Sequence, residues 1–241
     1  MKLTLDYLAY FDTETTGTDK EDRLVQIAYR YPAASEDVNA YFKAPLPIKY
    51  LAMAVHHITQ KMVDDRPAFI DDSVSSRIAT LAEQGVVFVA HNAQFDVKML
   101  AKEGIEIPTY ICTLKVIKYL DVDLKCECYQ QQYLRYLAGI EVEAHAHDAW
   151  GDILVLEQLF IRFLKTLMKR EKLSCEDAID KMISITLEPS EIKVFTFGKH
   201  KGVKIADIAQ SDNGYLKWLY KEKSGEEEPD EDWIYTLEKY V

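Results

Sequence analysis

The sequence predicts an α/β fold followed by a small module of mixed α and β structure. Two observations predict it: short apolar strands alternate with amphipathic helical segments over the first 170 residues, and the composition changes at the charged residues 169–172. The chain has 241 residues, of which 48% are hydrophobic. It is therefore long enough for one large packed domain with an appendage.

Three strands are predicted near the N-terminus. Residues 7–11 form an apolar, aromatic run that ends at Asp12, and residues 24–31 and 39–43 follow as the next two strands. The segment 32–37 between these two contains proline and aspartate and is typical of a turn. We therefore expect the three strands to form an antiparallel meander.

The rest of the large domain is predicted to be helical, with one more strand. Helices are expected over residues 50–57, 71–84, 92–103 and 148–169, and Gly85 and Gly104 end the second and third of them. The apolar run 86–90 predicts a buried strand. Apolar residues recur at helical spacing from Ile153 to Leu167, so the last helix is expected to be half-buried.

A separate C-terminal segment is predicted from about residue 192. Residues 194–197 and 203–205 flank a loop with glycine at both ends, which predicts a β-hairpin. Further helices are expected over residues 175–184, 207–222 and 233–241. The predicted organisation is a domain over residues 1–170, a linker with a helix over 171–190, and a small module over 191–241.

Composition limits the class of function. The formal net charge of -11 argues against a large basic surface, so nucleic-acid binding would depend on bound cations and local lysines. The four cysteines are irregularly spaced, and we interpret them as reduced structural thiols. No apolar run is long enough to span a membrane and the N-terminus lacks a signal-peptide pattern, so no membrane partner is expected and a cytoplasmic location follows by default.

Acidic residues occur at the ends of predicted buried elements. Asp12 and Glu14 lie two apart on an extended chain, so their side chains point to the same face. Asp96 lies in the first turn of a predicted helix, and His147 and Asp152 lie about one and a half turns apart at the start of the long helix. Together, such groups can hold two divalent cations and ionise a water, which suits hydrolysis of a phosphodiester.

Each of these residues has a simpler interpretation when it is taken alone. Asp12 and Glu14 can be the polar end of a strand, and Asp96 can stabilise a helix N-terminus through the helix dipole. A lone histidine is usually a cap or a solvated side chain. Asp148 is an alternative to Asp152 as the metal ligand. His145, like His147, can be a cap or a solvated side chain. Their occurrence together and in this order favours the catalytic interpretation.

In combination, these motifs resemble the DEDD exonuclease superfamily in its histidine-bearing (DEDDh) branch, over residues 5–168. Asp12 and Glu14 match the first motif, residues 89–96 the second and residues 146–152 the third, which selects His147 and Asp152 over their neighbours. Residues 54–59 are similar to a further family segment, except that histidine stands at position 57 where the family usually has glycine. The resemblance implies a ribonuclease H-like fold, with a mixed five-stranded sheet flanked by helices.

The resemblance also implies a mechanism. Asp12, Glu14, Asp96 and Asp152 would hold two Mg²⁺ or Mn²⁺ ions, with Asp96 acting mainly through metal-bound water. Neutral His147 would be the general base, and the reaction would release mononucleotides from DNA 3′ ends. Six neighbouring motif residues are implied as substrate contacts: Thr13, Thr15, His56, His91, Asn92 and Phe95.

Two features are similar to the exonuclease X group in particular, namely residues 111–115 and the C-terminal loop around residues 197–202. They favour DNA over RNA as the substrate. Two other functions stay possible: an RNA 3′-end-trimming enzyme, and a non-catalytic module that binds nucleic acid or a polymerase. The presence of all five catalytic residues counts against the second. The lysines of the loop either contact phosphate or keep an exposed loop soluble. The strand state of the substrate and the oligomeric state stay open.

Overall fold

The computed structural model describes residues 4–142, 148–227 and 229–241. The chain divides into two compact units, Met1–Thr186 and Leu187–Val241, and each is described by itself. Within the described ranges, no helix combines the length and the apolar composition needed to cross a bilayer.

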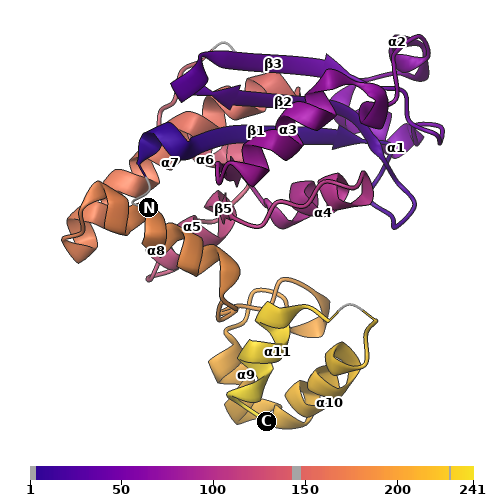
Figure 1. The fold of residues 1–241 in the computed structure, drawn as a ribbon. Coiled ribbons are helices and arrows are strands. Elements are labelled where there is room, and N and C mark those ends of the chain that lie inside the picture. Colours follow the sequence, from indigo (N-terminus) through magenta and orange to yellow (C-terminus); the bar gives the residue numbers. More distant parts are fainter. Residues whose placement is uncertain (1–3, 143–147, 228) are drawn as a thin grey trace. The chain divides into compact units, whose positions relative to one another are not determined.

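The first unit is built on a mixed five-stranded sheet with the order β3-β2-β1-β4-β5 (Figure 1). The strands are β1 (Leu8–Thr15), β2 (Leu24–Tyr31), β3 (Glu36–Tyr41), β4 (Val87–Ala90) and β5 (Tyr110–Cys112). The first three strands are antiparallel neighbours, whereas β4 runs parallel to β1 and β5 parallel to β4. The predicted meander and the five-stranded mixed sheet are confirmed.

Helices cover both faces of this sheet. They are α1 (Tyr50–His56), α2 (Gln60–Val63), α3 (Ser73–Glu83), α4 (Gln94–Lys102), α5 (Thr113–Leu120), α6 (Gln131–Leu137), α7 (Ala149–Glu171) and α8 (Cys175–Leu187). Figure 1 shows α7 and α3 on opposite sides of the sheet. The long helix α7 buries the apolar stripe that its sequence predicts, from Ile153 to Leu167.

Strand β1 lies in the middle of the sheet and is buried on both faces. Leu8 and Tyr10 belong to the apolar cluster that contains α7 and α8, whereas Ala9 and Phe11 belong to the cluster that contains α3 and α4. This alternation follows from the two-residue period of an extended chain. It also fixes the side of the sheet on which the polar residues after Phe11 emerge.

Several elements differ from their prediction. The third strand begins at Glu36 rather than at residue 39. Strand β5 and helices α5 and α6 were not predicted individually, because a three-residue strand and short helices give little periodic signal. Helix α8 packs Ala178, Ile179 and Met182 into the core of the first unit, so the structural boundary after Thr186 falls later than the predicted boundary at residue 170.

The second unit is small and mostly helical. It contains α9 (Ile205–Ser211), α10 (Asn213–Ser224) and α11 (Glu231–Glu238), which bury a core around Phe195, Leu216 and Trp233. The two arms of the predicted hairpin pair through an antiparallel bridge between Val194 and Lys204 and through backbone hydrogen bonds such as that from Phe195 N–H to the Val203 carbonyl oxygen, and residues 198–200 of its loop form a 3₁₀ turn. The helix predicted over residues 207–222 is two helices, which meet at Asp212.

Candidate active site

The end of β1 presents two carboxylates to the α7 side of the sheet. Asp12 and Glu14 continue the alternation of Leu8 and Tyr10, so their side chains lie on the face that α7 covers. Both side chains are half-buried. The register between β1 and β2 shifts at Glu14 and Thr15, where the strand ends.

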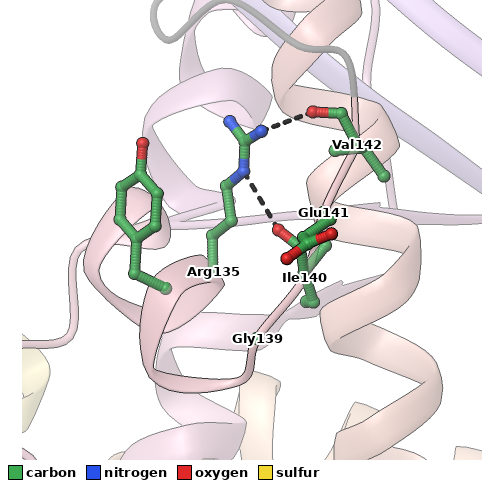
Figure 2. Close-up of a pocket in the computed structure, with 6 residues that line it drawn as sticks. Arg135, Gly139, Ile140, Glu141 and Val142 are labelled. Atoms are coloured by element: carbon green, nitrogen blue, oxygen red, sulfur yellow. Dashed lines mark hydrogen bonds between the residues drawn. The ribbon is translucent and has the colours of Figure 1, made fainter.

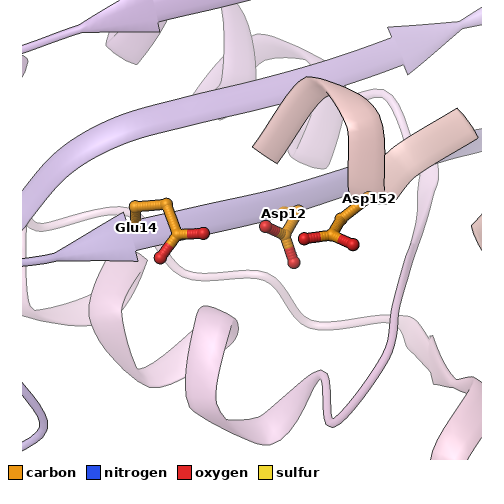
Figure 3. A group of neighbouring side chains, drawn as sticks. All are labelled: Asp12, Glu14 and Asp152. Carbon is orange, nitrogen blue, oxygen red and sulfur yellow. The ribbon is translucent and has the colours of Figure 1, made fainter. Parts of the chain in front are cut away.

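The first turn of α7 supplies the third carboxylate, Asp152. Each of Asp12, Glu14 and Asp152 offers an oxygen atom within 4.8 Å of the others, and the three side chains converge in Figure 3. Asp148 has another contact, because it is the N-cap of α7 and accepts hydrogen bonds from the Gly151 backbone N–H and from the Gln26 side chain. The structure therefore brings together the two residues of the first motif and the aspartate that the resemblance selected.

Asp96 lies beside this group rather than in it. It is in the first turn of α4, it is 3% exposed, and its Oδ1 accepts hydrogen bonds from both the backbone N–H and the hydroxyl of Thr13, at 3.1 and 2.6 Å. The hydrogen bonds fix Asp96 against β1 between Asp12 and Glu14. Thr13 therefore orients an acidic residue of the site.

The carboxylates raise one another's pKa values. Burial, followed by the charges of Asp96, Glu14 and Asp152, raises the pKa of Asp12 well above its usual range. Burial and the charge of Asp152 raise the pKa of Glu14 to about 8. Burial also raises the pKa of Asp96 to about 7, against the opposing effect of the Thr13 hydrogen bonds.

This set of groups fits a divalent cation. Crowded carboxylates in a poorly solvated place repel one another and hold protons above their ordinary pKa, and a hard cation with oxygen ligands relieves that repulsion. Among the described residues, no ion pair involves Asp12 or Glu14. The residues that would hold the cation are Asp12, Glu14 and Asp152, with Asp96 next to them.

Two of the predicted substrate contacts are histidines whose ring nitrogens are bonded within the protein. His56 Nδ1 accepts the Ile58 backbone N–H, so its Nε2 carries the proton and donates to the Thr15 carbonyl oxygen at 3.1 Å. His91 Nε2 donates to the Tyr129 carbonyl oxygen at 2.8 Å. Each ring therefore holds a backbone segment next to the site, and their contact with substrate stays a prediction.

The remaining predicted contacts lie around the same end of the sheet. Thr15 is buried and donates its hydroxyl to the Gly17 carbonyl oxygen. Asn92 is exposed with a φ of 66°, in the turn that leads into α4, and Phe95 is half-buried against the core. His57, at the position where the family has glycine, adopts a φ of 61° and ends α1 in the left-handed conformation that glycine favours.

His147 lies outside the described residues, and its role as general base stays a prediction. The described chain stops at Val142 before it and resumes at Asp148.

Two glutamines that sequence reasoning did not select contact the third carboxylate. The amide nitrogens of Gln131 and Gln132, at the start of α6, donate to Asp152 Oδ1 at 3.1 and 2.7 Å. These two hydrogen bonds fix the orientation of the Asp152 carboxylate toward Asp12 and Glu14. The only signal in the sequence is a run of three glutamines, which has no recognisable spacing relative to Asp152.

The same helix supports the segment before residue 143. Arg135 donates to the side-chain oxygen of Gln132 and to the carbonyl oxygens of Ile140 and Val142. Figure 2 shows Arg135 lining a pocket with Gly139, Ile140, Glu141 and Val142. Helix α6 therefore contacts Asp152 through Gln131 and Gln132, and it contacts residues 140–142 through Arg135.

Comparison with known proteins gives matches along both units. The sequence matches a family model described as Exonuclease over residues 10–160, and one described as Exodeoxyribonuclease X-like C-terminal over residues 195–224. It is 32% identical over 221 residues to Exodeoxyribonuclease 10 of Escherichia coli, covering 88% of this chain and 90% of that protein. It is also 33% identical to a DNA polymerase III subunit epsilon-like protein of Rhodobacter capsulatus, over 69% of this chain and 25% of that one.

A solved structure supports the same relationship. The structure of Exonuclease X in complex with 5′ overhanging duplex DNA matches with a TM-score of 0.57 and 27% identity, covering 74% of this chain and 99% of that chain.

The first prediction concerns stability and pH. The pKa of Glu14, about 8, and that of Asp96, about 7, lie above the values of about 4 in an unfolded chain, so the folded protein holds protons that the unfolded chain has released. These two groups therefore lower the stability of the metal-free protein as the pH rises from about 5 to 8. Thermal unfolding in chelator should show this loss, and added Mg²⁺ should raise the melting temperature more at pH 8.5 than at pH 5.

The Glu14→Gln variant is the control for this prediction, because it removes one of the titrating groups. Its melting temperature in chelator should fall less over the same pH range. A wild-type protein whose pH profile matches that of the variant would contradict the assignment of a proton to Glu14.

The second prediction concerns Gln132. Gln132→Ala removes the shorter hydrogen bond to Asp152 and should lower Mn²⁺ affinity by about 10- to 100-fold, the usual effect of losing a group that orients a ligand. Calorimetric titration with Mn²⁺ measures the affinity, and thermal unfolding in chelator should stay close to that of the wild type. Gln130→Ala is the matched control, because Gln130 is exposed and its side chain does not cap the helix. Equal affinities in the two variants would refute the role.

Proposed function

Because the chain belongs to the exonuclease family, we propose that it is a metal-dependent 3′→5′ exonuclease that releases mononucleotides from the 3′ ends of DNA. The observation that carries the proposal is the convergence of Asp12, Glu14 and Asp152 within 4.8 Å at the end of a buried strand. Two relatives support DNA as the substrate: one is called an exodeoxyribonuclease, and the other is solved with duplex DNA.

Two Mg²⁺ or Mn²⁺ ions are proposed for the site. When bound, such ions supply electrostatic stabilisation to the attacking and the leaving oxygen of a phosphodiester. Asp12 and Glu14 would hold them from β1, and Asp152 would do so from α7, where the two glutamines orient its carboxylate. Asp96 keeps its orientation through Thr13 and adds negative charge beside Asp12.

The remaining roles in the reaction belong to side chains of the protein itself. His147 would take a proton from the attacking water, and the proposal rests on the match of residues 146–152 to the third motif. His56 and His91 hold two backbone segments through hydrogen bonds to the carbonyl oxygens of Thr15 and Tyr129. Thr13, Thr15, Asn92 and Phe95 are proposed to contact the terminal nucleotide, because they lie on the same motifs as the acidic residues.

The third prediction is the direction and metal dependence of cleavage. Single-stranded DNA labelled at its 5′ end should shorten stepwise from the unlabelled end in Mg²⁺ or Mn²⁺ and stay intact in chelator, because the acidic group cannot act without a cation. Asp12→Asn should abolish shortening. A gel that resolves single nucleotides measures the ladder, and RNA of the same sequence run in parallel tests the choice of sugar.

Two outcomes would contradict this function. Release of the label as the first product would show attack from the 5′ end. Cleavage that persists in chelator would show that the acidic group is not the catalytic centre.

The fourth prediction separates the general base from the metal ligands. His147→Ala should lower turnover by about 10²- to 10⁴-fold, the usual contribution of a positioned base, with Mn²⁺ affinity unchanged. Asp152→Asn should lower both. Turnover on labelled DNA and calorimetric titration measure the two quantities in the same preparations. A parallel loss of cation affinity in His147→Ala would make the histidine a ligand instead.

A further inference from the structure

Helix α10 of the second unit has an exposed aromatic and basic face. Its buried side carries Leu216 and Leu219, which pack into the small core. Its other side carries Lys217, Trp218 and Lys221, all of them exposed. Trp218 is 52% exposed, whereas Trp233 in the same unit is 6% exposed. A single exposed aromatic side chain is ordinary on a protein surface, so the groups beside Trp218 decide whether it belongs to a binding surface.

The ring of Trp218 rests on other aromatic side chains that are anchored in the core. Its centroid lies 5.3 Å from that of Tyr215, one turn earlier in α10. Tyr215 contacts His200 at 4.8 Å and the buried Phe195 at 5.8 Å. The stack continues from the core to the surface, so Trp218 is held in place before any ligand arrives.

Basic side chains lie beside this aromatic stack and on the same helix. Lys199 Nζ lies 4.7 Å from the centroid of the Tyr215 ring and also pairs with Asp212 at 2.7 Å. Lys217 and Lys221 are four residues apart on α10 and therefore lie on the same face of the helix. Among the described residues, neither forms an ion pair, and one acid on that face, Glu222, is exposed as well. We call Lys199, Tyr215, Lys217, Trp218 and Lys221 the Trp218 surface.

Charge in the second unit is segregated along the sequence. Residues 193–223, which include the Trp218 surface, contain seven lysines and three acidic residues. Residues 224–241 contain seven acidic residues and one lysine. The segment of the sequence that carries Trp218 is therefore positive although the protein is acidic.

We propose that the Trp218 surface binds a single-stranded stretch of DNA, with Trp218 stacking on an unpaired base and the lysines contacting phosphates. Aromatic platforms within a basic surface are how proteins hold single strands without reading sequence, because every base has a face to stack on. A duplex offers no such face, which favours the unpaired strand. This inference rests on the proposed function only in taking DNA as the ligand. It assigns to the Trp218 surface a role in holding the substrate, which the acidic group of the first unit does not provide.

The fifth prediction tests this binding without cleavage. Fluorescence anisotropy of full-length protein with labelled oligo-dT of about 20 nucleotides, in chelator, reports binding when the acidic group cannot act. Trp218→Ala should weaken the affinity by about 5- to 100-fold, the usual effect of losing one base stack. Trp218→Phe should recover most of it and Trp218→Leu should not, because only an aromatic ring stacks.

The lysines have a separate readout. Lys217→Gln combined with Lys221→Gln should reduce the slope of log affinity against log salt by about 1.4, because each phosphate contact on a single strand contributes about 0.7. Turnover at saturating DNA in Mg²⁺ should stay unchanged in these variants while KM rises. Unchanged turnover shows that the acidic group still works, so failure of this inference is distinct from failure of the proposed function.

Tyr235→Ala is the matched control. Tyr235 is 41% exposed on α11 and lies under Lys239, but it belongs to the acidic segment. Its loss should leave the affinity for oligo-dT unchanged. Wild-type affinity in Trp218→Ala would overturn the inference, and so would an equal loss in Tyr235→Ala. Labelled RNA of the same length should bind with similar strength, because stacking does not read the sugar.

Discussion

Mutual repulsion among poorly solvated carboxylates is the constraint on which the candidate active site depends. Strand β1 is central and covered on both faces, yet it ends in Asp12 and Glu14, and Asp152 comes toward them from α7. A charge without a partner in such a place is costly, so the group must hold protons or bind a cation. The raised pKa values of Asp12, Glu14 and Asp96 correspond to the first state, and the proposed ions would provide the second.

The surrounding groups orient these carboxylates without neutralising them. Asp96 is held by the hydroxyl and the backbone N–H of Thr13, and Asp152 by the amides of Gln131 and Gln132. All of these donors are neutral. A lysine or arginine in the same position would orient a carboxylate equally well, but its charge would compete with a divalent cation for that carboxylate. Neutral donors therefore suit a site whose negative charge is needed for metal binding.

Much of the fold was predictable because burial imposes a period on the sequence. The run that ends at Asp12 and the apolar stripe of α7 predicted the central strand and the long helix correctly. The three-residue strand β5 and the helix α6 are too short to give such a period, so Gln131 and Gln132 could not be placed near Asp152. The hairpin prediction relied on flanking glycines, and the two arms do pair, but glycines do not specify the 3₁₀ turn that the loop contains.

The acidic net charge of the chain is compatible with DNA binding, because charges act locally. A net charge of -11 predicts weak attraction to DNA only if charges act over the whole molecule. Screening at physiological ionic strength limits their range to about 8 Å, so a phosphate responds to the groups near it rather than to the total. The acidic group of the first unit would attract phosphate only through bound cations, whereas the lysines around Trp218 need none. A protein with both would hold a strand when its cation site is empty and cut it only when that site is filled. Its net charge would then govern solubility more than substrate binding.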